Sequence, residues 1–173
     1  MNTAGNLRMN WRTCRMKKKI SFFIAYAHKN NRLAADLCER LKDHFQASKN
    51  FECTTWRDVD LLPGEEWDAR IRASIDQCDC GILLVSVPFL ISNYIKNVEL
   101  PSLMRPDKVI IPVGLRKIDF DHHDLHGLEK LQIYRYAKPD SAKLHFFSEL
   151  DDEGREDFVL DLFIQIENRL LTD

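Results

Sequence analysis

Apolar residues follow two patterns that alternate along the chain, and each pattern predicts one kind of element. Continuous apolar runs are typical of strands buried on both faces of a sheet, and they predict strands at 20–26, 80–87 and 108–115. Two shorter runs predict strands at 51–56 and 131–136. Around these runs, apolar residues recur every three or four positions, which predicts helices over 33–45, 67–75 and 158–170. Residues 93–104 predict an irregular short helix that Pro101 interrupts. Asn30 or Asn31 could cap the first helix.

Strands that alternate with helices in this way argue for a parallel sheet covered by helices on both faces. We therefore expect an α/β fold of the doubly wound, flavodoxin-like kind, with a five-stranded parallel sheet in the order 2-1-3-4-5. This fold takes up one domain over residues 17–173. Residues 1–16 show no clean periodicity, and we expect them to form a poorly ordered basic leader.

The total charge hides a polarity between the two ends of the chain. The 25 Lys and Arg against 27 Asp and Glu leave a net charge of −2, which excludes a generally basic nucleic-acid-binding protein. Residues 1–19 nevertheless carry six basic residues and no acidic one, whereas residues 146–173 carry nine acidic residues and two arginines. This polarity could steer self-association, or it could belong to a solvated leader and a solvated helix face. No stretch approaches the roughly 18 consecutive apolar residues of a membrane helix, so we expect no membrane partner.

The cysteines and histidines do not form a metal-binding pattern. The chain has five scattered cysteines, an odd count that fits a reducing cytoplasm better than a disulfide framework: Cys14, Cys38, Cys53, Cys78 and Cys80. Cys78 and Cys80 stand alone as C-x-C, without the second pair of ligands that zinc needs. His122 and His126 are four residues apart, but they lie in a surface connection without helical periodicity. We therefore expect no bound metal.

The predicted strand order brings four polar or aromatic residues to one edge of the sheet. In a sheet of order 2-1-3-4-5, ligands bind beyond the carboxyl ends of strands 1 and 3. Tyr26 ends the first strand, Asp58 follows the second, Ser86 ends the third, and Glu99 lies in the segment after it. No glycine-rich phosphate loop, phospho-accepting aspartate or G-x-S-x-G elbow accompanies them, which excludes the common nucleotide-binding, receiver and hydrolase sites.

Several of these segments resemble the bacterial TIR domain, the Toll/interleukin-1 receptor family. The resemblance runs over residues 19–136 and rests on ISFFIAYAHKN, WRDVDLLPGEEWDARI, LLVSVPFLISNYIKNVELPSLM and VIIPVGLRKIDF. Its most specific part is the combination W-x-D…P-G-x-x-W…S-x-x-F-x-x-S-x-Y-x-x-x-x-E. The resemblance implies a TIR fold.

For function, the resemblance implies a choice between two activities. Many TIR domains cleave NAD+ at the nicotinamide–ribose bond, and the glutamate of those enzymes aligns with Glu99. The activity would be that of an NAD+ glycohydrolase or ADP-ribosyl cyclase with NAD+ as substrate and no cofactor, in bacterial antiphage or abortive-infection immunity. Other TIR domains are non-catalytic scaffolds that bind further TIR protomers through a loop, which corresponds here to residues 58–66.

The same resemblance implies which partners and surfaces to expect. The loop presents an apolar tip for self-association into a homo-oligomer or filament, or it is a plain turn, at Leu61, Leu62, Pro63 and Gly64. A separate effector or sensor protein would complete the signalling. A weaker third reading is an enzyme like the nucleoside deoxyribosyltransferases, which would accept a nucleoside and ignore NAD+.

The reaction asks little of the protein beyond one carboxylate. Breaking an N-glycosidic bond builds positive charge on the ribose, and the carboxylate of Glu99 beneath the sugar would favour that charge. Nicotinamide leaves as a neutral molecule, so no general acid is needed. The alternative for Glu99 is an ordinary helix-terminal acid or a surface ion pair.

The other candidate residues would hold the substrate. Tyr26, Trp56 and Tyr94 could stack on a base, or could simply pack in the core or at its rim. The resemblance aligns the family's residue pair after the first strand with Tyr26 and Ala27. Arg57 could meet the pyrophosphate. Two further residues have alternative roles: Asp58 could bind a ribose hydroxyl or cap its loop, and Ser86 could contact the ligand or close its strand. The family often has a Trp where this chain has Ile95, which leaves the stacking of nicotinamide open.

Overall fold

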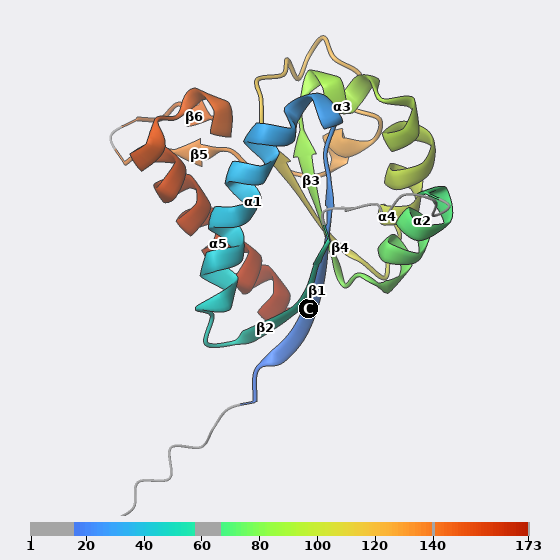
Figure 1. The fold of residues 1–173 in the computed structure, drawn as a ribbon. Helices are drawn as coiled ribbons and strands as arrows, with labels where there is room; N and C mark the ends of the chain where they lie inside the picture. Colours follow the sequence, from blue (N-terminus) through green and yellow to red (C-terminus); the bar gives the residue numbers. More distant parts are fainter. Residues whose placement is uncertain (1–15, 58–66, 140, 173) are drawn as a thin grey trace, which may run out of the picture.

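A parallel sheet of four strands forms the centre of the computed structural model, which describes residues 16–57, 67–139 and 141–172. Its strands are β1 (Lys18–Ala25), β2 (Phe51–Arg57), β3 (Cys80–Val85) and β4 (Val109–Gly114). They lie in the order β2-β1-β3-β4, and all three pairings are parallel (Figure 1). The first four places of the predicted order are therefore confirmed.

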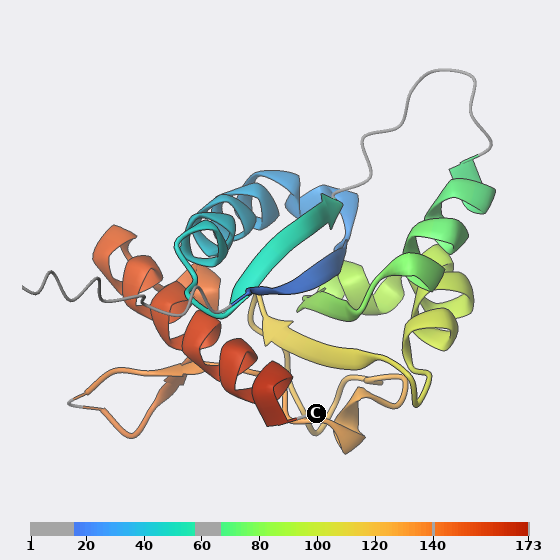
Figure 2. The same cartoon turned by 90° about the horizontal axis from the view of Figure 1, so that it is seen from below.

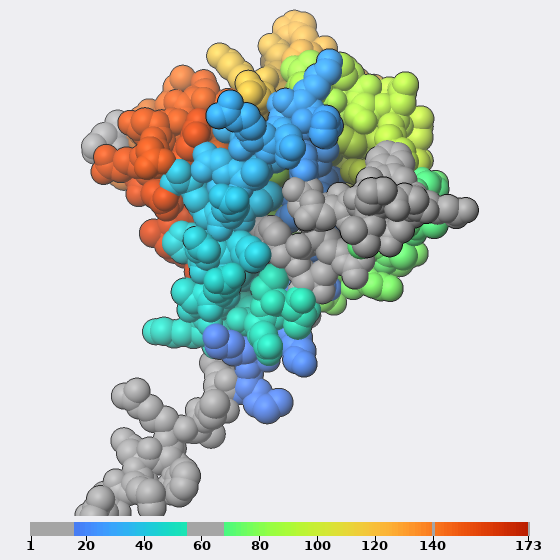
Figure 3. Space-filling view, in the orientation of Figure 1, coloured from blue at the N-terminus to red at the C-terminus, as the bar shows by residue number. Residues whose placement is uncertain are grey.

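Helices cover both faces of this sheet (Figures 1 and 2). One face carries α1 (Asn31–Gln46) and α5 (Asp152–Thr172). The other face carries α2 (Trp67–Gln77), α3 (Val87–Ile91), the π-helix η2 (Ile95–Glu99) and α4 (Leu100–Leu103). The space-filling view shows α1 lying across one side of the molecule, beside the C-terminal segments (Figure 3). The remaining elements are the 3₁₀-helices η1 (His28–Asn30), η3 (Leu128–Lys130) and η4 (Phe147–Glu149) and the strands β5 (Tyr136–Ala137) and β6 (Leu144–His145).

Successive side chains of the strands enter two separate cores, one on each face of the sheet. In β1, Phe22 and Ile24 pack with α1 and α5, whereas Phe23 and Ala25 pack with α2 and α3. All four side chains are at most 3% exposed. Because alternate residues of a strand point to opposite faces, a strand apolar at every position needs cover on both sides. This arrangement explains the continuous apolar runs and confirms the doubly wound α/β fold.

The predicted fifth strand at 131–136 is wrong. This segment touches the sheet at one parallel bridge, where Tyr134 donates its N–H to the Pro112 carbonyl at 2.8 Å and accepts from the Gly114 N–H at 2.8 Å. The next bond towards the start of the strand would need the N–H of Pro112, which proline lacks. Beyond the end of β4, a further bond to this segment would need the N–H of Arg116, which is already bonded to the Val85 carbonyl. Tyr136 and Ala137 instead pair antiparallel with β6.

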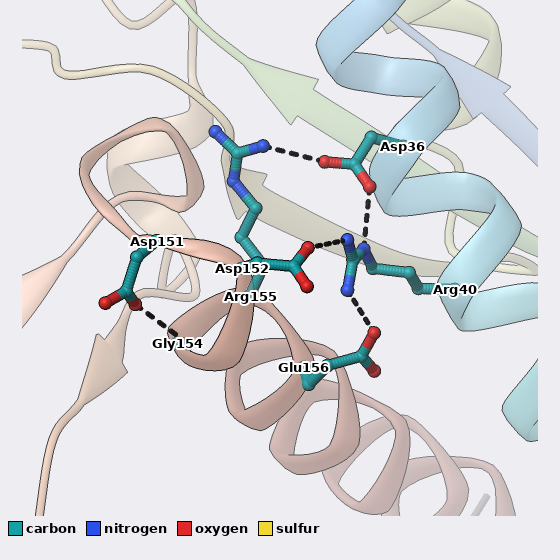
Figure 4. Close-up of polar contacts among 7 residues, drawn as sticks. All are labelled: Asp36, Arg40, Asp151, Asp152, Gly154, Arg155 and Glu156. Atoms are coloured by element: carbon teal, nitrogen blue, oxygen red, sulfur yellow. Dashed lines mark hydrogen bonds and ion pairs between the residues drawn. The ribbon is translucent and has the colours of Figure 1, made fainter.

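Ion pairs join α1 to the acidic start of α5 (Figure 4). Arg40 binds Asp36 on its own helix at 2.6 Å and Asp152 on α5 at 2.5 Å, and it also binds Glu156. Arg155 of α5 reaches back to the second oxygen of Asp36 at 2.9 Å. The surrounding carboxylates raise the pKa of Arg40. Part of the acidic excess of the last helix is therefore neutralised inside the domain.

Two sequence predictions concern the leader and a membrane span. The basic leader at 1–16 lies outside the described residues except for Met16, so its predicted order stays a prediction. Within the described residues, none of the helices combines the length and the apolar character that crossing a membrane requires.

Candidate functional site

A cleft of about 400 Å³ opens beyond the carboxyl ends of β1 and β3, at the edge where the strand order predicts a ligand. We call it the Glu99 cleft. One wall follows β1, and the other comes from α3 and η2. Its lining residues are Tyr26, Ala27, His28, Lys29, Pro88, Ile91, Ser92, Tyr94, Ile95 and Glu99. The structure thus brings together four of the predicted site residues: Tyr26, Ala27, Tyr94 and Glu99.

Glu99 is a buried carboxyl group in this cleft. Its side chain is 8% exposed, and its Oε2 atom is buried with no hydrogen-bond partner among the residues that the structure describes. Burial disfavours the charged form and raises the pKa of Glu99 to about 7. An ionisable group that is buried, unsatisfied and open to a cleft is available to a charge or a hydroxyl that enters from outside.

The π-helix η2 determines where Glu99 lies. Its last turn is closed by a hydrogen bond from the Leu100 N–H to the carbonyl of Ile95, five residues earlier, as in a π-helix. Pro101 follows directly and has no N–H to continue a regular α-helical ladder. Ile95 and Glu99 both line the cleft and are 3% and 8% exposed. The irregular helix predicted at 93–104 is confirmed, but Pro101 does not interrupt it, because α4 runs through this residue. The irregularity lies in η2, which ends at the candidate catalytic residue.

Ser86 is not among the residues that line the cleft. It is fully buried at 0% exposure, and its hydroxyl accepts the Phe89 N–H at 3.1 Å, which caps α3. The same hydroxyl accepts a hydrogen bond of 2.6 Å from the side-chain amide of Asn30. Asn30 does not cap α1 with its side chain, contrary to one possibility in the sequence. Of the two roles considered for Ser86, the structure shows closure of the strand end, and contact with a ligand stays a prediction.

Tyr94 is held from outside the cleft. Its phenol donates a hydrogen bond of 2.9 Å to one carboxylate oxygen of Asp68 on α2, whose other oxygen binds Arg72 at 2.8 Å. Burial is the main cause of the raised pKa of Tyr94, and the bond to Asp68 and the nearby charge of Glu99 add to it. The pKa of Asp68 is lowered by Arg72 first and then by Tyr94. Tyr94 is therefore a neutral hydrogen-bond donor facing an ionised acceptor.

The remaining predicted residues are placed only in part. Trp56 and Arg57 end β2 beside Phe22 and Phe23 of β1, which brings their backbone to the same edge of the sheet as the Glu99 cleft. Asp58 and the predicted self-association residues Leu61, Leu62, Pro63 and Gly64 lie outside the described residues.

Sequence reasoning did not single out His28 and Lys29, although both line the cleft. The available signal was their position directly after Tyr26 and Ala27, because a residue that follows a strand end can reach a site at that edge. Lys29 is exposed and adds a positive charge to the rim.

The histidines near residue 120 bind groups of their own loop and of α3. His122 pairs with Asp119 at 2.9 Å, and His126 pairs with Asp124 at 3.2 Å and with the Leu90 carbonyl at 2.9 Å. Across the described ranges, no three His, Cys, Asp or Glu side chains are grouped as metal ligands.

Two comparisons with known proteins bear on this site. A family model described as "TIR domain" matches residues 22–147, which include both walls of the Glu99 cleft. The chain is also similar to an uncharacterized protein, y4lF, of Sinorhizobium fredii (strain NBRC 101917 / NGR234), with 28% identity over 106 residues. The match covers 59% of this chain and 32% of that protein, so the chain spans about a third of its relative's length.

Proposed function

Since the chain belongs to the TIR domain family, we propose that it is an NAD+ glycohydrolase or ADP-ribosyl cyclase with Glu99 as its catalytic residue. The observation that carries this proposal is the buried carboxylate oxygen of Glu99, which has no partner among the described residues and belongs to a side chain that lines the cleft. Such an oxygen is suited to meet a sugar hydroxyl or a developing positive charge. The family includes enzymes of this activity as well as scaffolds.

The proposed reaction breaks the bond between C1′ of the ribose and the ring nitrogen of nicotinamide. The electron pair of that bond leaves with the ring, which departs neutral, and positive charge develops on the ribose. The ionised Glu99 stabilises this charge from within the cleft, where a low dielectric strengthens the interaction. Water then adds to C1′ and loses a proton, which gives ADP-ribose. If a nitrogen of the adenine ring adds instead, the product is a cyclic ADP-ribose.

Other groups of the cleft would bind and orient the substrate. Tyr26 and Tyr94 offer aromatic faces for a base, and the ammonium group of Lys29 lies at the rim, where it can meet a phosphate. Ile95 and Pro88 supply apolar walls that exclude water from the bond that breaks. Trp56, Arg57 and Asp58 would complete the site from the end of β2.

The rival function is that of a scaffold without catalysis. TIR domains generally associate with other TIR domains, and residues 58–66 would supply that contact here. A homo-oligomer or filament could also assemble the enzyme, so association alone does not separate the two functions. We propose further that the protein acts in the cytoplasm, in bacterial antiphage defence, with a separate sensor or effector. The four cysteines among the described residues are free thiols, which supports a reducing compartment.

The test is the release of nicotinamide from NAD+. The purified protein is incubated with NAD+ at high concentration or with a crowding agent, which favours assembly, and the products are separated by chromatography. We expect nicotinamide together with ADP-ribose or its cyclic form. Glu99→Gln keeps the size of the side chain but cannot ionise, and it should lose at least about a hundredfold in rate. If the wild type and Glu99→Gln release the same amount of nicotinamide under assembling conditions, the enzyme proposal fails and the scaffold function remains.

A further inference from the structure

We propose that Asp68 is a positioning residue of the Glu99 cleft, which holds the ring of Tyr94 in the wall where the substrate lies. Asp68 is on α2 and is not among the residues that line the cleft. It acts through Tyr94, which does line the cleft, five residues before Glu99. The consequence for turnover rests on the proposed function, whereas the hold on the ring does not.

The contact fixes both partners. The Tyr94 phenol donates to Asp68 Oδ1 at 2.9 Å, and Arg72 Nε donates to Asp68 Oδ2 at 2.8 Å. Because each carboxylate oxygen has its own donor, the carboxylate is held from two sides. Tyr94 has one end in the cleft and the other bonded to α2, so its ring has lost the freedom to turn out of the wall.

The ionisation states keep this contact in place over the working pH range. Arg72 and Tyr94 lower the pKa of Asp68, so Asp68 stays an ionised acceptor. The pKa of Tyr94 is raised by burial and by Asp68, so the phenol keeps its proton. A charge-assisted hydrogen bond of this kind is stronger than a neutral one, and it does not break near neutral pH.

The same contact contributes little to the stability of the fold. The side chains of Asp68 and Arg72 are 52% and 50% exposed, and surface ion pairs of this kind have small effects on unfolding. A ring at the edge of a binding site, in contrast, affects substrate orientation strongly, since small displacements alter turnover. Loss of Asp68 should therefore change how the substrate binds and leave the folded protein as stable as before.

The experiment compares Asp68→Ala with a matched control on the same helix. Asp76 lies eight residues further along α2, on the same face, and forms an exposed ion pair with Arg105 at 3.0 Å. We expect Asp68→Ala to raise the KM for NAD+ about fivefold, the worth of one hydrogen bond, with an unchanged melting temperature. Asp76→Ala should leave the KM unchanged. Asp68→Asn keeps an acceptor oxygen and should restore most of the affinity.

A double-mutant cycle tests whether Asp68 acts through Tyr94. Tyr94→Phe keeps the ring and removes the phenol oxygen, so it should raise the KM as Asp68→Ala does. The double variant should be no worse than either single variant, because the same bond is lost in all three. Effects that multiply in the double variant, or an equal rise in KM for Asp68→Ala and Asp76→Ala, would overturn the positioning role.

A spectroscopic readout separates this inference from the proposed function. The chain has four tyrosines, so NMR of protein labelled with ¹³C in the tyrosine rings gives few signals, and Tyr94→Phe identifies the one from Tyr94. We expect Asp68→Ala to shift that signal and Asp76→Ala to leave it in place. If the wild type neither binds nor cleaves NAD+, the proposed function fails, and the Tyr94 signal alone decides whether Asp68 holds the ring. If that signal does not move, the inference fails whatever the activity.

Discussion

The side-chain amide of Asn30 donates a hydrogen bond of 2.6 Å to the hydroxyl of Ser86, and this bond ties the two walls of the Glu99 cleft together. Asn30 ends η1, which follows Tyr26 and Ala27, and Ser86 caps α3. Both side chains are at most 3% exposed. A buried polar bond of this kind fixes the spacing of the elements that it joins, because breaking it leaves a polar group without a partner.

Ser86→Ala should therefore destabilise the protein by about 1–3 kcal/mol, since it leaves the Asn30 amide and the first turn of α3 without their acceptor. Urea unfolding followed by circular dichroism measures this loss. A matched control is Ser74→Ala, because Ser74 is also buried but its hydroxyl bonds to the Arg70 carbonyl of its own helix at 2.8 Å. The control should change the free energy of unfolding by less than about 0.5 kcal/mol. Equal losses in the two variants would contradict the structural role given to Ser86.

Glu99 should make stability depend on pH. Burial raises its pKa from an ordinary value of about 4.5 to about 7, so the fold disfavours the ionised form. Stability is then lost as the pH rises from about 4.5 to about 7, and the loss is complete above that range. Glu99→Gln cannot ionise and escapes the loss. Its advantage in free energy of unfolding over the wild type should grow by about 2 kcal/mol between pH 5 and pH 8. A difference that stays constant over this range would show that Glu99 is not buried in solution.

The proposed activity should need the ionised form of Glu99, because only a carboxylate stabilises positive charge on the ribose. We expect kcat/KM for NAD+ to rise about tenfold per pH unit below pH 7 and to level off above it. Bound NAD+ carries a positive nicotinamide ring, which favours the ionised carboxylate. The inflection in kcat should accordingly lie at lower pH than that in kcat/KM. A flat profile from pH 5.5 to 8.5 would argue against this role for Glu99.

Arg40 should contribute to stability through the network between α1 and α5. Arg40→Ala leaves three carboxylates, Asp36, Asp152 and Glu156, close together without their shared cation. We expect a loss of about 1–2 kcal/mol in the free energy of unfolding at low salt, and a smaller loss in 1 M NaCl, which screens the repulsion. Arg72→Ala removes one exposed pair within a helix and should cost no more than about 0.5 kcal/mol. A loss for Arg40→Ala that is independent of salt would point to packing of its side chain instead.

The position of the candidate site was predictable from the strand pattern, because the carboxyl ends of adjacent parallel strands share one edge of the sheet. Tyr26 and Glu99 are 73 residues apart, yet the order of β1 and β3 places both at one cleft. The burial of Glu99 was not predictable in the same way. It depends on a π-turn before Pro101, and periodicity does not report such turns.

The features that the sequence alone does not reveal have equally local causes. The run at 131–136 has the composition of a strand, but whether it pairs depends on Pro112 in its neighbour, and a pattern within one segment carries no such information. Ser86 was placed at the correct edge, and only its bond to Asn30 shows that its hydroxyl is already occupied. The role of Asp68 was not predicted, because an exposed acid on a helix has no distinctive sequence signal. Its partner Tyr94 is 26 residues further along the chain, so the bond between them is not visible in a local pattern.

Pro112 also has a consequence for how copies of this protein can meet. Among the described residues, β4 is paired with β3 on one side and makes backbone hydrogen bonds only to Tyr134 on the other. An unfinished sheet edge is a template onto which a strand from another molecule can add, and this is a common route to aggregation. A proline in such a strand leaves a gap in the row of donors that an incoming strand would need. The residue that denies the sheet its fifth strand should therefore also limit edge-to-edge pairing between copies of this domain.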